Sequence, residues 1–179
     1  VPYSIKAGAG RFHDAESHPT LKLTTAGVLA QSSNVGTIQI GALLSNDDLY
    51  GYLKKFGIGQ STGSHLPGES AGLLPAVNTW SATTAPTIAF GQGYSVTALQ
   101  ATNVFATIAN NGVRVNPTII AGTFDESGSF KKSSPAQTTR VVSATTATKM
   151  RLMMESVVSE QGTAPAAAIP GYRVAGKTG

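Results

Sequence analysis

Two short stretches, "QSSNVG" (Gln31–Gly36) and "GKTG" (Gly176–Gly179), carry the most information in this sequence. Each combines small polar side chains with glycine. A serine hydroxyl can both donate and accept a hydrogen bond, and a lysine that is partly removed from water has a lowered pKa. Serine and lysine therefore supply groups that can move a proton, but residue types alone do not assign Ser32, Asn34 or Lys177 to an active site.

Taken singly, neither stretch is specific. Ser32–Asn34 can equally be a polar turn between two helices, and Lys177–Gly179 can be the end of a strand with a solvated lysine. Only the presence of both, in this order, favours a catalytic interpretation.

The sequence around the first stretch predicts three helices. One begins near Thr24 or Thr25, and a second follows the Ser-Ser-Asn turn, with apolar residues at helical spacing. The segment "SNDDLYGYLKKFGIG" predicts a third helix, capped by Ser45 or Asn46 and ended by Gly57. The glycine- and proline-rich residues 58–93 are expected to be an ordered excursion that buries Trp80, Ile88 and Phe90.

The second half predicts further helices and strands. "VTALQATNVFATIANNG" has a capping-box pair, Thr97 and Gln100, and an apolar face. That face comprises Leu99, Ala101, Val104, Phe105 and Ile108. Residues 113–124 and 129–142 predict two strands around a turn at 125–128. Ser143 is expected to cap a helix that runs to about Glu160. Residues 171–179 predict a strand that carries Lys-Thr-Gly.

Composition excludes several classes of function. Of 179 residues only 12% are charged, the net charge is +4, and the basic residues are scattered, which argues against nucleic-acid binding. There is no cysteine, no His/Asp/Glu cluster with metal-ligand spacing and no phosphate-binding loop, so we expect neither metal nor cofactor. No apolar stretch is long enough to span a membrane.

The two stretches resemble the second and third motifs of the penicillin-binding proteins, whose set is S-x-x-K, S-x-N and K-T-G. The resemblance extends over residues 23–179, through "LTTAGVLAQSSNVGTIQIG", "FGIGQSTGSHLPGESAGLLP" and "IAFGQGYSVTALQATNVFATIANNGVRVNPTII". "FGQG" followed by "VTALQ" is similar to the class B transpeptidases of septal or elongating wall synthesis, although Ala98 stands where proline is common. The resemblance implies an α+β fold with helices packed on an antiparallel sheet, most of whose strands lie outside this chain.

The resemblance also implies an activity. A serine would be acylated by the D-Ala-D-Ala end of a peptidoglycan stem peptide, and β-lactams would mimic that dipeptide. Ser32 matches the hydroxyl that relays a proton, Asn34 the amide that holds the substrate, and Lys177 the cation that biases Ser32. Ser33, Thr178 and Gly179 match substrate-binding positions, Thr178 by bonding the substrate carboxylate.

Partners and location follow from the same resemblance. Stem peptides and β-lactams are the expected ligands, and membrane proteins of the division or elongation machinery are the expected partners. The expected location is the extracytoplasmic face of the bacterial cell membrane, with the anchor outside this chain.

The nucleophile itself is expected outside residues 1–179. Only 31 residues precede Ser32, and in the family the S-x-x-K motif comes well before S-x-N. The one S-x-x-K here, Ser129 to Lys132, lies between the other motifs in a charged turn, which makes it a decoy. We therefore expect a partial transpeptidase domain over residues 1–179, inactive alone and completed by further sequence or by a complementary chain.

Three alternatives stay open at this point. A serine β-lactamase would need a deacylating carboxylate, for which Glu69 is the loop candidate, although a turn or salt-bridge role suits it better. A penicillin-sensing or catalytically silent scaffold would share the fold. A Ser-His-Asp hydrolase would use His13, His18 or His65, but no G-x-S-x-G elbow is present, and these are expected to be surface histidines.

Overall fold

The chain forms a mixed α and β fold, described by a computed structural model for residues 1–64, 66–134 and 136–179. The α-helices are α1 (Thr25–Ala30), α2 (Asn34–Gly41), α3 (Asn46–Phe56), α4 (Thr84–Ala89), α5 (Ala98–Ala109) and α6 (Ala144–Glu155). The strands are β1 (Ser4–Ala7), β2 (Gly10–His13), β3 (Val113–Val115), β4 (Gly122–Phe124), β5 (Phe130–Lys132) and β6 (Thr138–Arg140). Two short 3₁₀ turns, η1 (Val77–Thr79) and η2 (Pro165–Ala167), complete the described elements.

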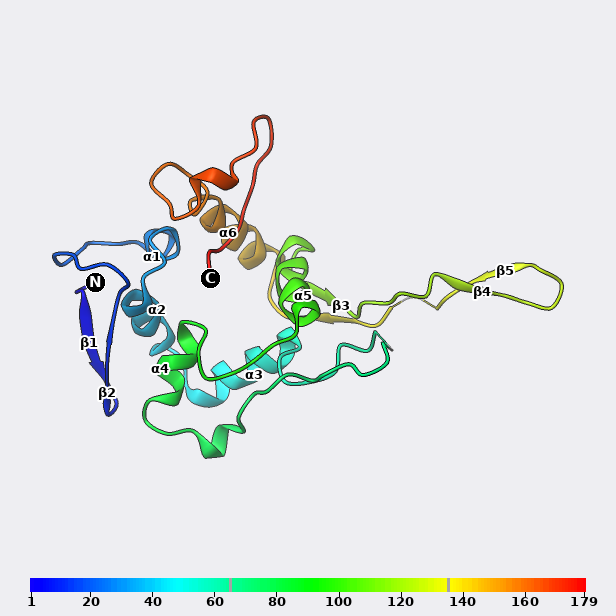
Figure 1. The fold of residues 1–179 in the computed structure, drawn as a ribbon, viewed down its shortest axis with the longest axis horizontal. Coiled ribbons are helices and arrows are strands. Elements are labelled where there is room, and N and C mark those ends of the chain that lie inside the picture. The colour runs from blue at the N-terminus through cyan, green and yellow to red at the C-terminus, as the bar shows by residue number, and fades with distance from the viewer. Residues whose placement is uncertain (65, 135) are drawn as a thin grey trace.

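The helices make one cluster. The β1–β2 pair lies on one side of this cluster, and the β4–β5 pair extends away on the other side (Figure 1). Helix α1 contacts α2 and α6, α2 contacts α4, and α5 contacts α3, α6 and β3. The buried apolar side chains come from several of these helices and from the segments between them: Val28, Val35, Ile38, Ile58, Ile88, Val141, Ala147 and Val157. The C-terminal residues return to the helix cluster and end beside α1, α2 and α6 (Figure 1).

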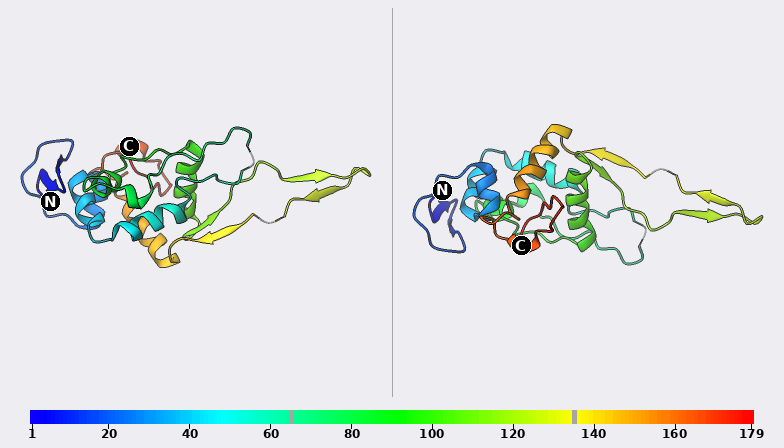
Figure 2. Two further views of the ribbon diagram at one scale, coloured as in Figure 1. Left: turned by 90° about the horizontal axis from the view of Figure 1, so that it is seen from below. Right: turned by 90° about the horizontal axis from the view of Figure 1, so that it is seen from above.

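The strands pair as antiparallel ribbons of two. In the described ranges, β1 pairs with β2, β3 with β6, and β4 with β5. The β4–β5 ribbon projects far from the helices (Figures 1 and 2). Its turn is closed by Asp125, whose carboxylate accepts from the backbone N–H groups of Ser127 and Ser129. The predicted pair of strands around residues 125–128 is thus confirmed, with a break between β3 and β4 where Pro117 removes a backbone donor.

The predicted helix ends are confirmed at most positions. The hydroxyls of Thr24, Ser45, Thr97 and Ser143 each accept a backbone N–H in the first turn of α1, α3, α5 and α6. Gly57 ends α3 with φ of 96°, a left-handed conformation that favours glycine. Local sequence decided these ends because each cap needs only its own first or last turn.

Gln100 links α5 to two distant segments. Its side chain, only 1% exposed, accepts from the Thr97 N–H over 2.8 Å to complete the capping box. Its amide also donates to the carbonyl oxygens of Gln60 and Ala71, each over 2.8 Å. The excursion over residues 58–93 is therefore fastened to the helix cluster by a buried amide as well as by Ile88.

Two predictions about the helices differ from the structure. The deeply buried side of α5 is polar, formed by Gln100, Asn103 and Thr107, whereas Phe105 on the predicted apolar face is 46% exposed. A hydrophobic pattern does not show which neighbouring elements cover a helix, and α5 contacts α3, α6 and β3. Helix α6 ends at Glu155 rather than near Glu160, because Ser156 caps it and the chain turns.

The segment 171–179 is not a strand among the described elements. A strand needs a neighbouring backbone to form its ladder. Among the described residues, this segment makes two isolated backbone bonds, from Tyr172 N–H to Ile169 O over 3.0 Å and from Gly176 N–H to Met154 O over 3.3 Å. Among the helices of the described residues, none combines the length and apolarity needed to cross a bilayer.

Replacing Gln100 by methionine, which has a similar volume, tests this buried link. We expect the free energy of unfolding to fall by about 2–4 kcal/mol, because each buried group left without a partner costs about 1–3 kcal/mol. Urea unfolding measures the change. The exposed Gln137 offers a matched control, and Gln137→Met should cost less than about 0.5 kcal/mol. Equal losses for both variants would contradict the link.

Candidate active site

The loop between α1 and α2 has an unusual backbone conformation at its centre. Ser32 has φ of 53°, a left-handed conformation that costs a non-glycine residue about 1–3 kcal/mol. Backbone bonds hold the loop against α1, from Ser32 N–H to Leu29 O over 3.1 Å and from Ser33 N–H to Val28 O over 3.0 Å. Such strain persists only where the surrounding structure imposes it, as at many functional sites.

Lys177 lies directly on the Ser32 hydroxyl. Its ammonium donates to Ser32 Oγ over 2.6 Å and to the carbonyl oxygen of Thr178 over 2.7 Å. Partial desolvation lowers the pKa of Lys177 below its usual value. A cation this close stabilises negative charge that develops on Ser32 Oγ. The fold thus brings the two sequence stretches into contact across 145 positions.

The loop that follows α6 contacts both stretches. The amide of Gln31 donates to the carbonyl oxygen of Gln161 over 2.9 Å. The hydroxyls of Thr163 and Thr178 are hydrogen-bonded to each other over 2.9 Å. The sequence offered no signal for this loop, because its residues have no motif and the contacts are set by where α6 ends.

A cavity of about 580 Å³ opens beside the Ser32–Lys177 contact. It is lined by Leu29, Ser32, Asn34, Thr37, Ala89, Phe90, Gly91, Gln92, Lys177, Thr178 and Gly179. A cation, hydroxyls and an amide therefore meet at one face of a cavity, with glycines where a ligand backbone could approach closely. Such a set can bind a carboxylate and an amide and can move a proton at Ser32 Oγ. Ser32 is the only serine among the described residues that line the cavity.

Asn34 and Ser33 take different places. Asn34 reaches the cavity, and its amide also donates to the carbonyl oxygen of His13 over 3.2 Å. The sequence predicts Ser33 among the substrate-binding residues, but the structure places it in the interior, 3% exposed and not lining the cavity. Its hydroxyl caps α2 by accepting from Gly36 N–H over 2.9 Å.

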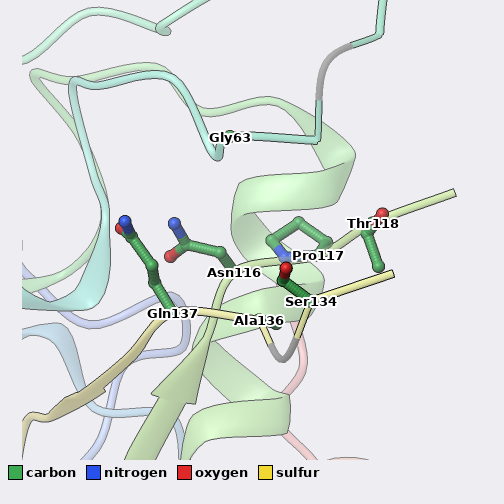
Figure 3. A pocket seen from close by; sticks show the side chains of 7 residues that line it. All are labelled: Gly63, Asn116, Pro117, Thr118, Ser134, Ala136 and Gln137. Carbon is green, nitrogen blue, oxygen red and sulfur yellow. The ribbon is translucent and has the colours of Figure 1, made fainter. Parts of the chain in front are cut away.

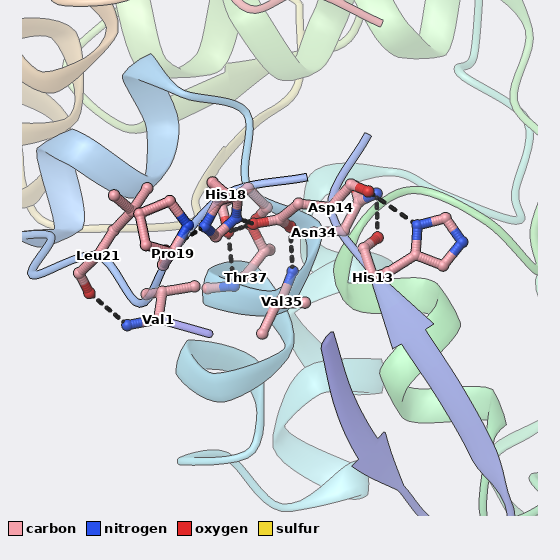
Figure 4. Close-up of polar contacts among 11 residues, drawn as sticks. Val1, His13, Asp14, His18, Pro19, Leu21, Asn34, Val35 and Thr37 are labelled. Atoms are coloured by element: carbon pink, nitrogen blue, oxygen red, sulfur yellow. Dashed lines mark hydrogen bonds and ion pairs between the residues drawn. The ribbon is translucent and has the colours of Figure 1, made fainter. Parts of the chain in front are cut away.

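Sequence reasoning missed Asp14, a buried carboxylate whose bond to Val35 is drawn in Figure 4. It accepts from the Ser33 hydroxyl over 2.7 Å and from Val35 N–H over 2.8 Å. His18 Nε2 lies 2.9 Å from the same carboxylate. The prediction of a surface histidine is therefore wrong for His18, which is held in a partly buried pair, whereas His13 is exposed.

Other candidate residues lie away from the cavity. Ser129 and Lys132 belong to the projecting β4–β5 ribbon, and the Ser129 hydroxyl accepts from the Ser127 hydroxyl, as expected of a decoy. His65 lies outside the described residues. Within the described part of the chain, no group of three or more His, Asp or Glu side chains could hold a metal ion.

The Glu69 carboxylate holds its loop together by accepting hydrogen bonds from Ser61 and Thr62. Hydrogen bonds from the hydroxyl groups of Thr62 and Ser61 and from the Thr62 N–H lower the pKa of Glu69 to about 2. It does not line the 580 Å³ cavity. The turn role expected of Glu69 holds, but its partners are hydroxyls and an amide, and neither ion pair in the described residues includes it.

A second cavity, of about 330 Å³, lies where the ribbon leaves β3 and β6 (Figure 3). It is lined by Gly63, Asn116, Pro117, Thr118, Ser134, Ala136 and Gln137. These residues include no ionisable side chain. This second cavity therefore lacks the groups that a proton-transfer site needs.

Comparisons with known proteins return one family for this chain. Residues 4–179 match the family model described as the penicillin binding protein transpeptidase domain. The penicillin-binding protein PbpB of Mycobacterium tuberculosis is 46% identical over all of this chain, and the peptidoglycan D,D-transpeptidase FtsI of Escherichia coli is 37% identical. The chain spans only 27% and 28% of the lengths of these two relatives.

Solved structures give the same result. Penicillin binding protein 3 of M. tuberculosis complexed with aztreonam is 45% identical and superimposes with a TM-score of 0.96. The same protein complexed with ampicillin gives 0.97. These matches cover 99% of this chain and 41% and 40% of the solved chains.

The depressed pKa of Glu69 predicts a pH-dependent stability. The carboxylate should stabilise the fold fully above pH 4.5, and this contribution should disappear as the pH falls from 4.5 towards about 2. The difference in melting temperature between the wild type and Glu69→Gln should therefore shrink below pH 4.5. A difference that stays constant from pH 7 to pH 3 would rule out this role. The exposed Glu126→Gln serves as the control and should show little difference at any pH.

Proposed function

Because the chain belongs to the penicillin-binding protein transpeptidase family, we propose that residues 1–179 are part of the transpeptidase domain of a peptidoglycan D,D-transpeptidase. A serine outside these residues attacks the carbonyl carbon between the two D-alanines of a stem peptide. The peptide bond breaks, D-alanine leaves with a proton on its nitrogen, and an acyl-enzyme forms. An amine of a neighbouring stem then takes the acyl group and regenerates the serine. These 179 residues alone are inactive.

The observation that carries the proposal is the contact between Lys177 Nζ and Ser32 Oγ at the rim of the cavity. Ser32 relays a proton to the leaving nitrogen, since its hydroxyl can accept one proton while it gives another. Lys177 keeps that hydroxyl oriented by donating to it. The same ammonium stabilises the negative charge that Ser32 carries during transfer.

The substrate is held by the other groups at the cavity. The C-terminal carboxylate of the stem peptide binds the Thr178 hydroxyl and is attracted by Lys177, a charge-assisted contact. Asn34 bonds the peptide amide, and Gly179 allows the ligand backbone to approach. β-Lactams offer a strained amide with an acidic group beside it, a carboxylate in ampicillin and a sulfonate in aztreonam, and complexes of the M. tuberculosis protein with both support β-lactam binding.

The parent protein then acts where peptidoglycan is cross-linked, at the extracytoplasmic face of the bacterial cell membrane. Division or elongation proteins of that membrane are its proposed partners. The name of the E. coli relative, a peptidoglycan D,D-transpeptidase, supports the cell-wall substrate.

A serine β-lactamase is the second candidate, since it shares the acylation step. It would also need a carboxylate that activates water beside the acyl group. Glu69, the candidate from sequence, is bonded to Ser61 and Thr62 and does not line the cavity. The transpeptidase is therefore favoured.

Penicillin acylation of the complete transpeptidase domain tests the roles of Lys177 and Asn34. The wild type should gain the mass of one penicillin, measured by intact mass spectrometry. Lys177→Ala and Asn34→Ala should each slow acylation about a hundredfold or more, as expected for the loss of an aligned catalytic donor. Lys132→Ala, in the projecting ribbon, should acylate at the wild-type rate. Unchanged acylation in Lys177→Ala would refute the assignment.

The lifetime of the penicillin adduct separates the two enzyme classes. A transpeptidase should keep its adduct long after free penicillin is removed, whereas a β-lactamase should release it within its turnover time. Time-resolved mass spectrometry measures the decay. Glu69→Gln should leave the decay unchanged, and an adduct that becomes longer-lived in this variant would favour the β-lactamase.

A further inference from the structure

Asp14 has features of a group that serves the active site without touching a ligand. Asp14 is only 6% exposed, and it does not line the 580 Å³ cavity. Its carboxylate is nevertheless bonded to Ser33 and Val35, the first and third residues after Ser32. A carboxylate buried this deeply is retained only where hydrogen bonds offset its desolvation.

The carboxylate and the Ser33 hydroxyl together fix the first turn of α2. Asp14 Oδ1 accepts from Val35 N–H over 2.8 Å, and Asp14 Oδ2 accepts from Ser33 Oγ over 2.7 Å. Ser33 Oγ in turn accepts from Gly36 N–H over 2.9 Å. Two of the backbone donors that a helix leaves free at its start are thereby satisfied, and a negative charge lies at the positive end of the helix.

The neighbouring residue extends this anchor to the motif itself. The carbonyl oxygen of His13 accepts from Asn34 Nδ2 over 3.2 Å (Figure 4). Residues 13 and 14 therefore contact Ser33, Asn34 and Val35 in succession. A change at Asp14 would therefore loosen the loop that carries Ser32.

His18 keeps Asp14 in the form that can do this. His18 Nδ1 lies 2.7 Å from Pro19 O, and Nε2 lies 2.9 Å from Asp14 Oδ2. A carbonyl oxygen and an ionised carboxylate can only accept, so these two contacts favour the protonated ring, and the bonds to Pro19 and Asp14 raise the pKa of His18. Burial raises the pKa of Asp14, but the hydrogen bonds from Val35, His18 and Ser33 outweigh it, and the pKa is lowered overall.

We propose that Asp14 is a positioning residue for acylation, which holds the Ser32 hydroxyl beside Lys177 Nζ by anchoring Ser33 and the first turn of α2. The left-handed backbone of Ser32 needs such an anchor, because a relaxed loop would turn its hydroxyl away from Lys177. The inference rests on the proposed function, since it concerns the efficiency of the proton transfer assigned to Ser32.

The test uses the full-length protein with Asp14→Asn and Ser33→Ala, separately and together. Asparagine has the shape of aspartate but presents an N–H₂ where a second acceptor is needed. Acylation by penicillin is followed over a range of concentrations, which separates the maximal rate constant from the half-saturating concentration. Circular dichroism gives the folded fraction, so that each rate is expressed per folded molecule.

The maximal rate constant should fall about tenfold to a hundredfold in both single variants, since a misplacement of about 1 Å can cost about a hundredfold. The half-saturating concentration should change less than about threefold, because Lys177 and Thr178 are untouched. The double variant should be little slower than the slower single variant, because both changes break one anchor. Asp125→Asn is the matched control, since Asp125 also accepts from a serine hydroxyl and backbone N–H groups, and its rate should be unchanged.

A maximal rate constant within about twofold of the wild type in the folded variants would overturn the inference and leave the proposed function standing. If Asp14→Asn does not fold, Ser33→Ala decides by the same criterion. A wild-type protein that never acylates would overturn the proposed function itself, an outcome visible before any variant is compared.

Discussion

The hydrogen bond from Lys177 Nζ to Ser32 Oγ is the contact on which the candidate site depends. It joins residues from opposite ends of the chain, and it needs Ser32 to keep a left-handed backbone that an isolated peptide would abandon. The strain is small against the contacts that surround it: backbone bonds to α1 on one side and a capped α2 on the other. The fold therefore tolerates backbone strain at Ser32, and in return the Ser32 hydroxyl lies next to the Lys177 ammonium. Such an arrangement is typical of preorganised sites.

Both partners of this contact are supported from behind. The loop after α6 bonds Gln31 on one side and Thr178 on the other, so it ties the two motif segments through a third. Asp14 and His13 support the opposite side of the Ser32–Asn34 loop. The 580 Å³ cavity lies on the face that these supports leave open. Each of these supporting segments lacks a recognisable motif. A site defined only by its motif residues therefore leaves out the segments that hold those residues in place.

Prediction from the sequence succeeded where the cause is local. Helix caps such as Thr97 and the left-handed stop at Gly57 follow from one turn of chain, and the structure has them as expected. The sequence also predicted that Ser32 and Lys177 belong together, from a resemblance that the family match supports. It failed on the buried side of α5, because a hydrophobic pattern gives a face but not the elements that cover it. It failed on His18 for the same reason, since nothing near His18 in sequence except Asp14 indicates its burial.

The sequence alone therefore determined the family, most of the helix caps and the residue types available for proton transfer and carboxylate binding, because these depend on short stretches of the chain. Only the tertiary structure decided which hydroxyl faces the cavity. Ser32 and Ser33 are adjacent and chemically identical, yet Ser33 is buried as the cap of α2 and Ser32 meets Lys177. The physical reason is the turn at Ser32, whose left-handed backbone sends the two neighbouring side chains in different directions and is held by contacts from distant segments.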